Sequence, residues 1–214
     1  MTPKFSKAVD PIFLYVLDLM ERLENDADSV NPSDERVRIL KRIDSAENLL
    51  GQTPDWELAK YAISGWIDQL LITAPWSGGN WWKNNNLEFG YFRSGTAYTN
   101  FYTQAKQAQA LSGKDALEVY YLCVVMGFRG LYGDVNSLQY AQQLGLPADL
   151  ETWAKQTAAS LQLGQGRSPI LERPKPGDGA PPLNGHNKLV NMSLFAVVML
   201  ALCCSGYYIY FGNS

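Results

Sequence analysis

Apolar residues recur at helical spacing over most of positions 1–163 of this 214-residue chain. A first helix is predicted from an apolar face that repeats every three or four residues and contains Val9, Ile12, Phe13, Val16, Leu17, Met20 and Leu23. After the polar segment 24–32, we expect a second helix with Ser33 as its N-cap and Gly51 at its end. Its apolar stripe begins with Val37, Leu40 and Ile43.

The same periodicity predicts five further helices and no strand. Thr53 is the expected N-cap of the third helix, with Pro54 at its first position. Positions 74–95 are expected to be irregular, because their runs of Asn and Gly do not pack a core. Helices are then predicted over 96–111, 115–128, 135–144 and 147–163. The helix over 115–128 is apolar nearly all round, which is typical of the central helix of a bundle.

The composition changes after position 163. Residues 164–188 are dominated by Pro and Gly, a composition typical of a flexible tether, with an ordered surface loop as the alternative. Residues 189–211 contain no Asp, Glu, Lys, Arg or Pro. As a helix this stretch would be ~34 Å long, enough to cross a ~30 Å hydrocarbon core. We therefore predict a single C-terminal transmembrane helix; the alternative is a buried core helix.

The flanking charges predict the orientation of this span. Four cations, Arg167, Arg173, Lys175 and Lys188, precede it, and only the uncharged tail 212–214 follows. By the positive-inside rule, residues 1–188, which include the helical domain 1–163, lie in the cytoplasm and the C-terminus lies on the other side of the membrane. The first residues show no signal-peptide pattern.

The composition argues against nucleic-acid binding and against the common enzyme classes. The net charge is −3, whereas nucleic-acid-binding faces are usually basic. His186, the only histidine, falls in the tether, so no Ser-His or Cys-His pair can form inside the domain. The three cysteines match no zinc spacing, and no phosphate-binding loop is present. We expect no catalytic residue, metal or cofactor, although carboxylates brought together by folding remain an open alternative.

Two segments carry the most specific motifs. The first is Ile67-Asp68-Gln69-Leu70-Leu71, followed by the tryptophans Trp76, Trp81 and Trp82, then Gly95 and the pair Phe101-Tyr102. The second has the spacing E-x-x-Y-L-C-x-x-x-G-F-x-G-x-Y and comprises Glu118, Tyr121, Leu122, Cys123, Gly127, Phe128, Gly130 and Tyr132. Over roughly residues 10–163 the chain resembles the DotU/TssL family of type VI secretion systems, called IcmH/DotU in type IVb systems.

The resemblance implies an all-α cytoplasmic domain of two small bundles, with about seven helices in total, on a single transmembrane helix. It implies a non-enzymatic scaffold in the bacterial inner membrane, with its C-terminus in the periplasm. The implied partners are a TssM/IcmF-like membrane protein, TssK- and TssE-like baseplate subunits, the lipid bilayer and a second copy of the chain. The alternatives are a type IVb component and, in a different class, a tail-anchored enzyme or ligand-binding domain.

The chain departs from the family pattern at three positions. Gln69, Thr96 and Leu131 stand where the family usually has Glu, Glu and Arg, so the acidic cleft that the family is thought to use for baseplate docking is less negative here. We expect Asp68 and Gln69 to contact a partner, although Asp68 has a structural alternative in hydrogen bonding to the following loop.

Other candidate contacts also have structural alternatives. Arg129 either contacts a partner, bonds the last carbonyls of its helix or pairs with a carboxylate. Trp76, Trp81 and Trp82 are either exposed interface anchors or fold back over the domain. Gly127 and Gly130 are expected to permit positive φ or close backbone approach where the helix ends.

The predicted span offers a face for self-association. Ser193, Val197, Ala201 and Ser205 fall at four-residue spacing, and small residues at this spacing let two helices approach closely. We therefore predict a homodimer through this face.

Overall fold

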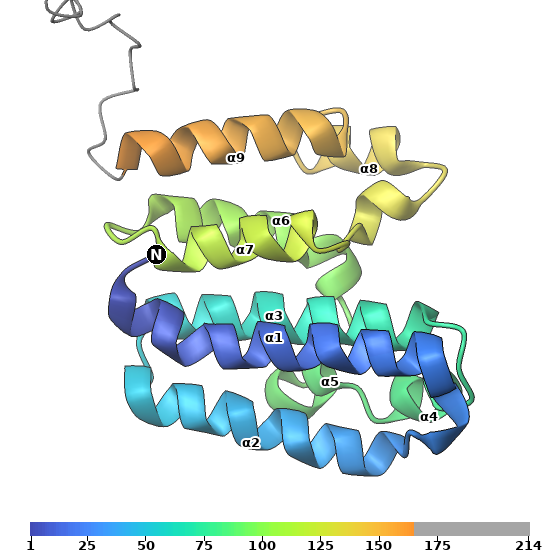
Figure 1. The fold of residues 1–214 in the computed structure, drawn as a ribbon. Helices are drawn as coiled ribbons and strands as arrows, with labels where there is room; N and C mark the ends of the chain where they lie inside the picture. The colour runs from blue at the N-terminus through green and yellow to red at the C-terminus, as the bar shows by residue number, and fades with distance from the viewer. Residues whose placement is uncertain (165–214) are drawn as a thin grey trace, which may run out of the picture. The chain divides into compact units, whose positions relative to one another are not determined.

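The computed structural model describes residues 1–164 of the chain. These residues form nine α-helices and two short 3₁₀ helices (Figure 1). In chain order they are α1 (Pro3–Asp26), η1 (Ala27–Ser29), α2 (Pro32–Leu50), α3 (Pro54–Thr73), α4 (Gly79–Asn84), α5 (Leu87–Phe92), α6 (Ala97–Ala110), α7 (Asp115–Val125), η2 (Gly130–Gly133), α8 (Ser137–Gln143) and α9 (Leu150–Gly164). The all-α prediction is confirmed for this part of the chain.

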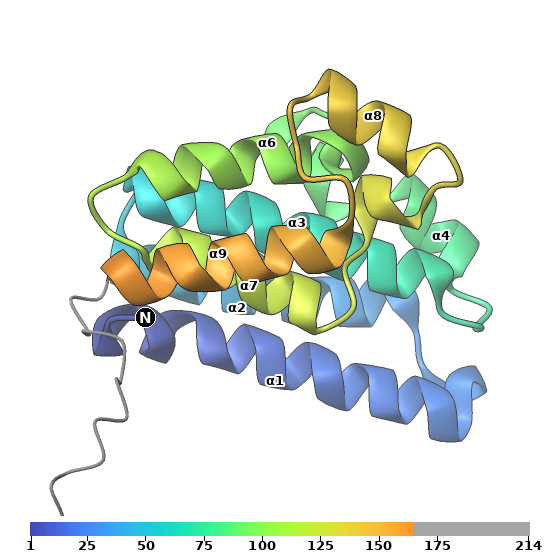
Figure 2. The same cartoon turned by 90° about the horizontal axis from the view of Figure 1, so that it is seen from above.

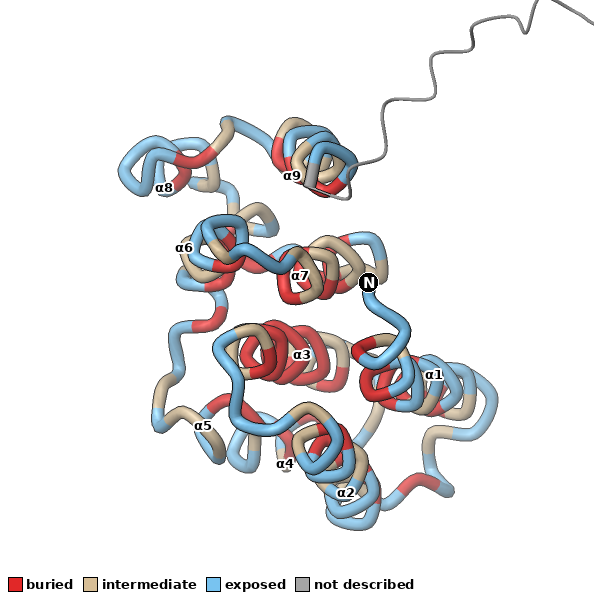
Figure 3. Tube along the Cα trace, turned by 90° about the vertical axis from the view of Figure 1, so that its left-hand side faces the viewer, coloured by how far each residue is buried: buried red, intermediate tan, exposed pale blue. Residues whose placement is uncertain are grey.

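Helix α3 is the centre of the domain. Figure 1 shows α6 and α7 on one side of it and α2, α4 and α5 on the other, with α1 alongside. Helix α9 lies along the outer side of α7 (Figures 1 and 2). In Figure 3, where buried residues are red, α3 is red along most of its length. The prediction that the helix over 115–128 is the central one is therefore wrong. Helix α3 buries Lys60, Ser64 and Asp68 together with its apolar residues, so its sequence resembles that of a half-exposed helix.

The helix ends follow local capping chemistry. Thr53 Oγ1 accepts the N–H of Trp56 at 3.2 Å, as expected, and Gly51 ends α2 with φ 75°. Ser33 was expected to cap α2, but Asn31 does so, because its Oδ1 accepts the N–H groups of Ser33 at 2.9 Å and Asp34 at 3.4 Å. The helix therefore starts earlier, with Pro32 at its first position.

The buried face of α2 also differs from the prediction. Val37 is 65% exposed, and the face that packs against α1 and α3 is made of Glu35, Ile39, Ile43 and Ala46. On α1, Leu17 is likewise 44% exposed. The error on α2 arises because its stripe includes a buried carboxylate, which a count of apolar residues excludes.

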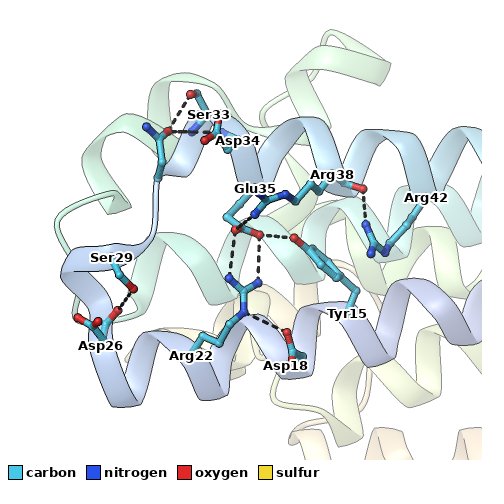
Figure 4. A network of polar contacts seen from close by, with 11 residues as sticks. Tyr15, Asp18, Arg22, Asp26, Ser29, Ser33, Asp34, Glu35, Arg38 and Arg42 are labelled. Atoms are coloured by element: carbon cyan, nitrogen blue, oxygen red, sulfur yellow. Dashed lines mark hydrogen bonds and ion pairs between the residues drawn. The ribbon is translucent and has the colours of Figure 1, made fainter.

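Glu35 is that carboxylate, and it joins α1 to α2 (Figure 4). Its two oxygens accept hydrogen bonds from Arg22 at 3.1 and 3.2 Å and from Arg38 at 2.6 Å, and the Tyr15 hydroxyl also donates to it. Burial works to raise the pKa of Glu35, but the hydrogen bonds from Arg22 and Tyr15 hold it below its ordinary value. The Arg42 guanidinium lies 3.6 Å from the centre of the Tyr15 ring.

Positions 74–95 are not irregular, because they contain α4 and α5. Trp82 on α4 and Leu87 on α5 are completely buried and give the segment its own part of the core. The side chain of Asn86 caps α5 by accepting the N–H of Phe89 at 2.8 Å.

Within residues 1–164, no helix combines the length and the apolar character needed to cross a bilayer. The predicted span 189–211, its dimer face (Ser193, Val197, Ala201 and Ser205), the tail 212–214 and the tether from residue 165 onwards lie outside the described residues.

Candidate functional site

A cavity of about 250 Å³ opens between α3 and the segment that runs from the start of α5 to the start of α6. Its lining combines apolar, amide and carboxylate side chains from three helices and three loops: Gly65, Asp68, Gln69, Ile72, Thr73, Asn86, Glu88, Gly95, Ala97, Tyr98 and Phe128. Two of the residues predicted to contact a partner, Asp68 and Gln69, are therefore together in its wall. Glu88 is a third polar wall residue that the sequence did not reveal.

Asp68 ties α4 and α5 to α3. Its Oδ1 accepts the indole N–H of Trp82 at 2.8 Å and the backbone N–H of Leu87 at 2.9 Å, while Oδ2 accepts the N–H of Glu88 at 2.8 Å. Burial raises the pKa of Asp68 to about 6, and these three hydrogen bonds work in the opposite direction. The structural alternative predicted for Asp68, hydrogen bonding to the following loop, is therefore present.

Glu88 fixes the next connection along the chain, between α5 and α6, in a similar way. Its side chain is buried, and Oε1 accepts the Ser94 hydroxyl at 2.6 Å and the N–H groups of Thr96 and Ala97, both at 2.8 Å. The Tyr61 hydroxyl approaches the same oxygen at 3.4 Å. One carboxylate oxygen thus fixes the α5–α6 connection and satisfies N–H groups at the start of α6.

Gln69 joins α3 to the turn after α7. Its Oε1 accepts the N–H of Gly130 at 2.8 Å and of Arg129 at 3.3 Å, and its Nε2 donates to the carbonyl of Gly127 at 3.4 Å. An amide serves both purposes, whereas a carboxylate could only accept. The residue that departs from the family pattern is therefore fitted to this turn through both its donor and its acceptor.

The turn itself confirms the role expected of its glycines. Gly127 has φ 106° and Gly130 has φ 49°, a region that favours glycine. A Cβ on Gly130 would lie 2.8 Å from the carbonyl oxygen of Tyr98. Arg129 between them is exposed, and its Nη1 donates to the carbonyls of Val124 and Phe128, each at 3.3 Å. Of its alternatives, bonding to the helix-end carbonyls is the one seen.

The three tryptophans differ in exposure. Trp82 is completely buried and donates to Asp68, so the prediction of an exposed anchor is wrong for this residue. Trp76 and Trp81 are half-buried against the core, and the Trp76 indole donates to the carbonyl of Leu71 at 2.7 Å. Trp82 packs into the core between α3 and α4, and the expectation of an irregular segment did not include this part of the core.

The second motif mainly builds the interior. Cys123 and Phe128 are buried, and the Phe128 ring stacks on Phe101 with centroids 4.0 Å apart. Tyr121 and Leu122 are half-buried at the edge of the core. Tyr132 donates to the carbonyl of Pro147 at 2.7 Å, which links η2 to the segment between α8 and α9. Glu118 pairs with the amino group of Met1.

This arrangement can receive a partner group, but it contains no obvious reactive centre. Folding does bring two carboxylates, Asp68 and Glu88, to one cavity, which is the alternative that the sequence left open. Both carboxylates, however, hold neighbouring segments in place: Asp68 accepts backbone and indole donors on both oxygens, and Glu88 accepts backbone and hydroxyl donors on Oε1. No histidine, cysteine or lysine of the described residues lies in the cavity wall to act with them as an acid–base partner. Among residues 1–164, no group of three or more potential metal ligands is found.

Comparison with known proteins assigns the chain to a family. A solved structure, the cytoplasmic domain of TssL from Acinetobacter baumannii, has a similar fold with a TM-score of 0.57 at 20% identity. The similarity covers 75% of this chain and 98% of that chain. No protein with curated annotation matches the sequence significantly. Residues 4–212 match the family described as "Type VI secretion system protein DotU". The chain therefore belongs to the DotU/TssL family and is a type VI secretion system component.

Proposed function

We propose that this protein is a non-enzymatic scaffold of the bacterial inner membrane that joins the trans-envelope complex of the secretion system to the cytoplasmic baseplate. The observation that carries the proposal is the family match over residues 4–212, which includes both the helical domain and the uncharged stretch 189–211. In this proposal the stretch is a single transmembrane helix, the helical domain is cytoplasmic, and the partners are a TssM/IcmF-like membrane protein and TssK- and TssE-like baseplate subunits.

The cavity between α3 and the α5–α6 connection is the proposed docking surface. Gln69 lies in its wall, and Arg129 is exposed on the adjoining turn. Trp76 and Trp81 are only half-buried and can contribute to the contact with a partner. Asp68 and Trp82 have an indirect role, because their hydrogen bond holds α4 against α3. A surface built on rigid helices with a small polar recess is a suitable recognition element for a protein partner.

The direct test is purification of the full-length tagged protein from its native membranes in mild detergent, followed by mass spectrometry. We expect a large membrane protein of the TssM/IcmF type and soluble baseplate subunits to co-purify. A second variant, Trp82→Phe, breaks the buried hydrogen bond between Trp82 and Asp68 and should lose baseplate subunits before it loses the membrane partner. Recovery of the chain alone, while other envelope complexes survive the detergent, would contradict the scaffold function.

We further propose that two copies associate through the face formed by Ser193, Val197, Ala201 and Ser205. Replacing Ala201 and Ser205 with Leu should lower self-association in a membrane reporter assay, because the larger side chains keep the two backbones apart. An unchanged reporter signal would reject this face. The control is a pair of substitutions on the opposite side of the predicted helix, Ala196→Leu and Cys203→Leu.

A further inference from the structure

The two carboxylates of the cavity differ in how much of their hydrogen-bonding capacity is used. Asp68 receives donors on both oxygens. Glu88 receives all its donors on Oε1, and among the described residues none donates to Oε2. An ionised carboxylate can accept on both oxygens.

The unpaired oxygen of Glu88 keeps contact with solvent, and the residue lines the cavity. Glu88 lines the cavity and is only 7% exposed, so more than nine-tenths of the side chain is buried. Within residues 1–164, the buried side-chain atoms without a hydrogen bond are Asp55 Oδ1, Ser64 Oγ and Tyr120 Oη. Glu88 Oε2 has no hydrogen bond and is not one of these buried atoms, so part of its surface is accessible to solvent. A buried carboxylate with one oxygen unused favours a cationic hydrogen-bond donor.

The walls of the cavity match the rest of a long cationic side chain. Gly65, Ile72 and Ala97 provide an apolar surface for a hydrocarbon stem, and the rings of Tyr98 and Phe128 also face the space. No Lys, Arg or His is among the lining residues, so a cation entering the cavity meets no like charge in its wall. Aromatic rings stack on a planar guanidinium, which favours arginine over lysine.

We infer that the cavity receives one cationic side chain, preferably arginine, from a protein partner, and that Glu88 Oε2 is its counter-ion. The inference rests on the proposed docking function and makes its chemistry specific. It also reassigns the acidic character of the cleft in this chain. Residue 69 is an amide engaged with the 127–130 turn, and Asp68 is saturated, so Glu88 provides the available negative charge.

The test is a titration of the full-length chain in detergent micelles, with its isoleucine methyl groups labelled with ¹³C. The Ile72 methyl signal reports on the cavity wall. The probes are Nα-acetyl-arginine methylamide, its lysine analogue and its uncharged norleucine analogue, with KCl added to keep the ionic strength constant. We expect saturable shifts with a Kd of about 1 mM for arginine, weaker binding for lysine and none for norleucine.

Glu88→Gln should weaken arginine binding at least about tenfold, because it keeps an acceptor at Oε1 and removes the charge. Glu57→Gln, a partly exposed carboxylate outside the cavity, is the matched control and should bind as the parent chain does. If Glu88→Gln unfolds, Thr73→Lys provides the second variant. It changes an exposed residue at the cavity rim and should block the probe with its own ammonium group.

Equal shifts with arginine and norleucine, no shift with arginine, or undiminished binding by both Glu88→Gln and Thr73→Lys would overturn the inference. These outcomes are independent of the proposed function. If the chain co-purifies with baseplate subunits but does not bind the arginine probe, the scaffold function is supported and the binding of a cationic side chain in the cavity is rejected. If the chain binds the probe through Glu88 but no partner co-purifies, the cationic site is supported and the scaffold function is rejected.

Discussion

The carboxylate of Asp68 accepts the indole N–H of Trp82 at 2.8 Å; Trp82 is completely buried, and Asp68 is only 6% exposed. This bond explains how a segment rich in Asn and Gly folds as two short helices. Isolated helices of six residues are not stable in water, so α4 and α5 depend on contacts with the rest of the domain. Asp68 provides three such contacts from one side chain, and Trp82 fills the space between α3 and α4.

Replacing Trp82 with Phe should therefore destabilise the domain by about 3 kcal/mol. The substitution removes one of the two donors to the buried Oδ1 of Asp68 and leaves a small void in the core. The measurement is urea unfolding of the full-length chain in detergent, followed by circular dichroism. Trp81→Phe is the control and should cost much less, because Trp81 is half-buried and its indole makes no comparable bond to a carboxylate. Equal losses of unfolding free energy for the two variants would contradict a stabilising role of the Asp68–Trp82 hydrogen bond.

Asp68 should also make the stability of the domain depend on pH. Its folded pKa of about 6 lies above the ordinary value of 3.8, so between these values the folded state holds a proton that the unfolded chain has released. The free energy of unfolding therefore falls as the pH rises, by roughly 2 kcal/mol between about pH 4.5 and about pH 6.5. The lowered pKa values of Glu35 and Glu47 have the opposite effect, but only below their ordinary value of 4.5.

Asp68→Asn should abolish this slope. Unfolding midpoints in urea, followed by tryptophan fluorescence across this pH range, provide the measurement, because all six tryptophans lie within residues 1–164. Asp10→Asn, an exposed position on α1, is the control and should keep the slope of the parent chain. A parent chain whose midpoint rises with pH in this window would show that Asp68 remains ionised in the folded state.

Much of the helical framework could be predicted from the sequence, because capping and periodicity are local. Thr53 and Gly51 define their helix ends through bonds within a few residues, and the glycines at 127 and 130 indicate a turn through their own backbone freedom. The central role of α3 and the existence of α4 and α5 could not be predicted in this way. Both depend on buried polar groups such as Asp68, whose partners lie 14 to 20 residues away.

The same reason explains why Glu88 was missed as a site residue. A glutamate two residues after the N-cap Asn86 is common in the first turn of any helix. Its burial depends on the return of the chain at Thr96 and Ala97, which a single sequence does not reveal. Gln69 was recognised through a family pattern, but its contacts with the 127–130 turn became visible only in the fold.

Gln69→Glu, which restores the residue usual in the family, should destabilise this chain by about 1 to 2 kcal/mol. The glutamate keeps an acceptor for Gly130 but cannot donate to the carbonyl of Gly127, and it places a second carboxylate next to Asp68. Urea unfolding near neutral pH measures the effect, with Gln139→Glu on the exposed side of α8 as the control. An increase in stability would mean that the amide donor contributes nothing to the turn.

Gly130→Ala should destabilise the domain by about 2 kcal/mol or more. The residue has φ 49°, and the added Cβ would meet the Tyr98 carbonyl oxygen at 2.8 Å, so both backbone strain and a steric clash oppose the change. Gly95→Ala is the matched control, because a Cβ there meets no atom within 4 Å. Thermal unfolding of the two variants should separate them clearly, and equal melting temperatures would refute the steric argument.

Glu35→Gln should weaken the packing of α1 on α2 by roughly 3 kcal/mol. The carboxylate is 2% exposed and neutralises Arg22 and Arg38, so a neutral amide leaves two guanidinium groups around an uncharged acceptor. The amide also presents N–H groups to the donors on Arg22, which removes one of its two bonds.

Because the pKa of Glu35 is lowered in the folded state, the stabilisation that it gives is present above pH 4.5 and is lost as the pH falls through the folded pKa. The difference in unfolding free energy between the parent chain and Glu35→Gln should therefore be largest near neutral pH and shrink in acid. Glu24→Gln, an exposed residue of α1, should show no such difference at any pH. A Glu35→Gln variant as stable as the parent near neutral pH would mean that desolvation of the buried carboxylate cancels its ion pairs.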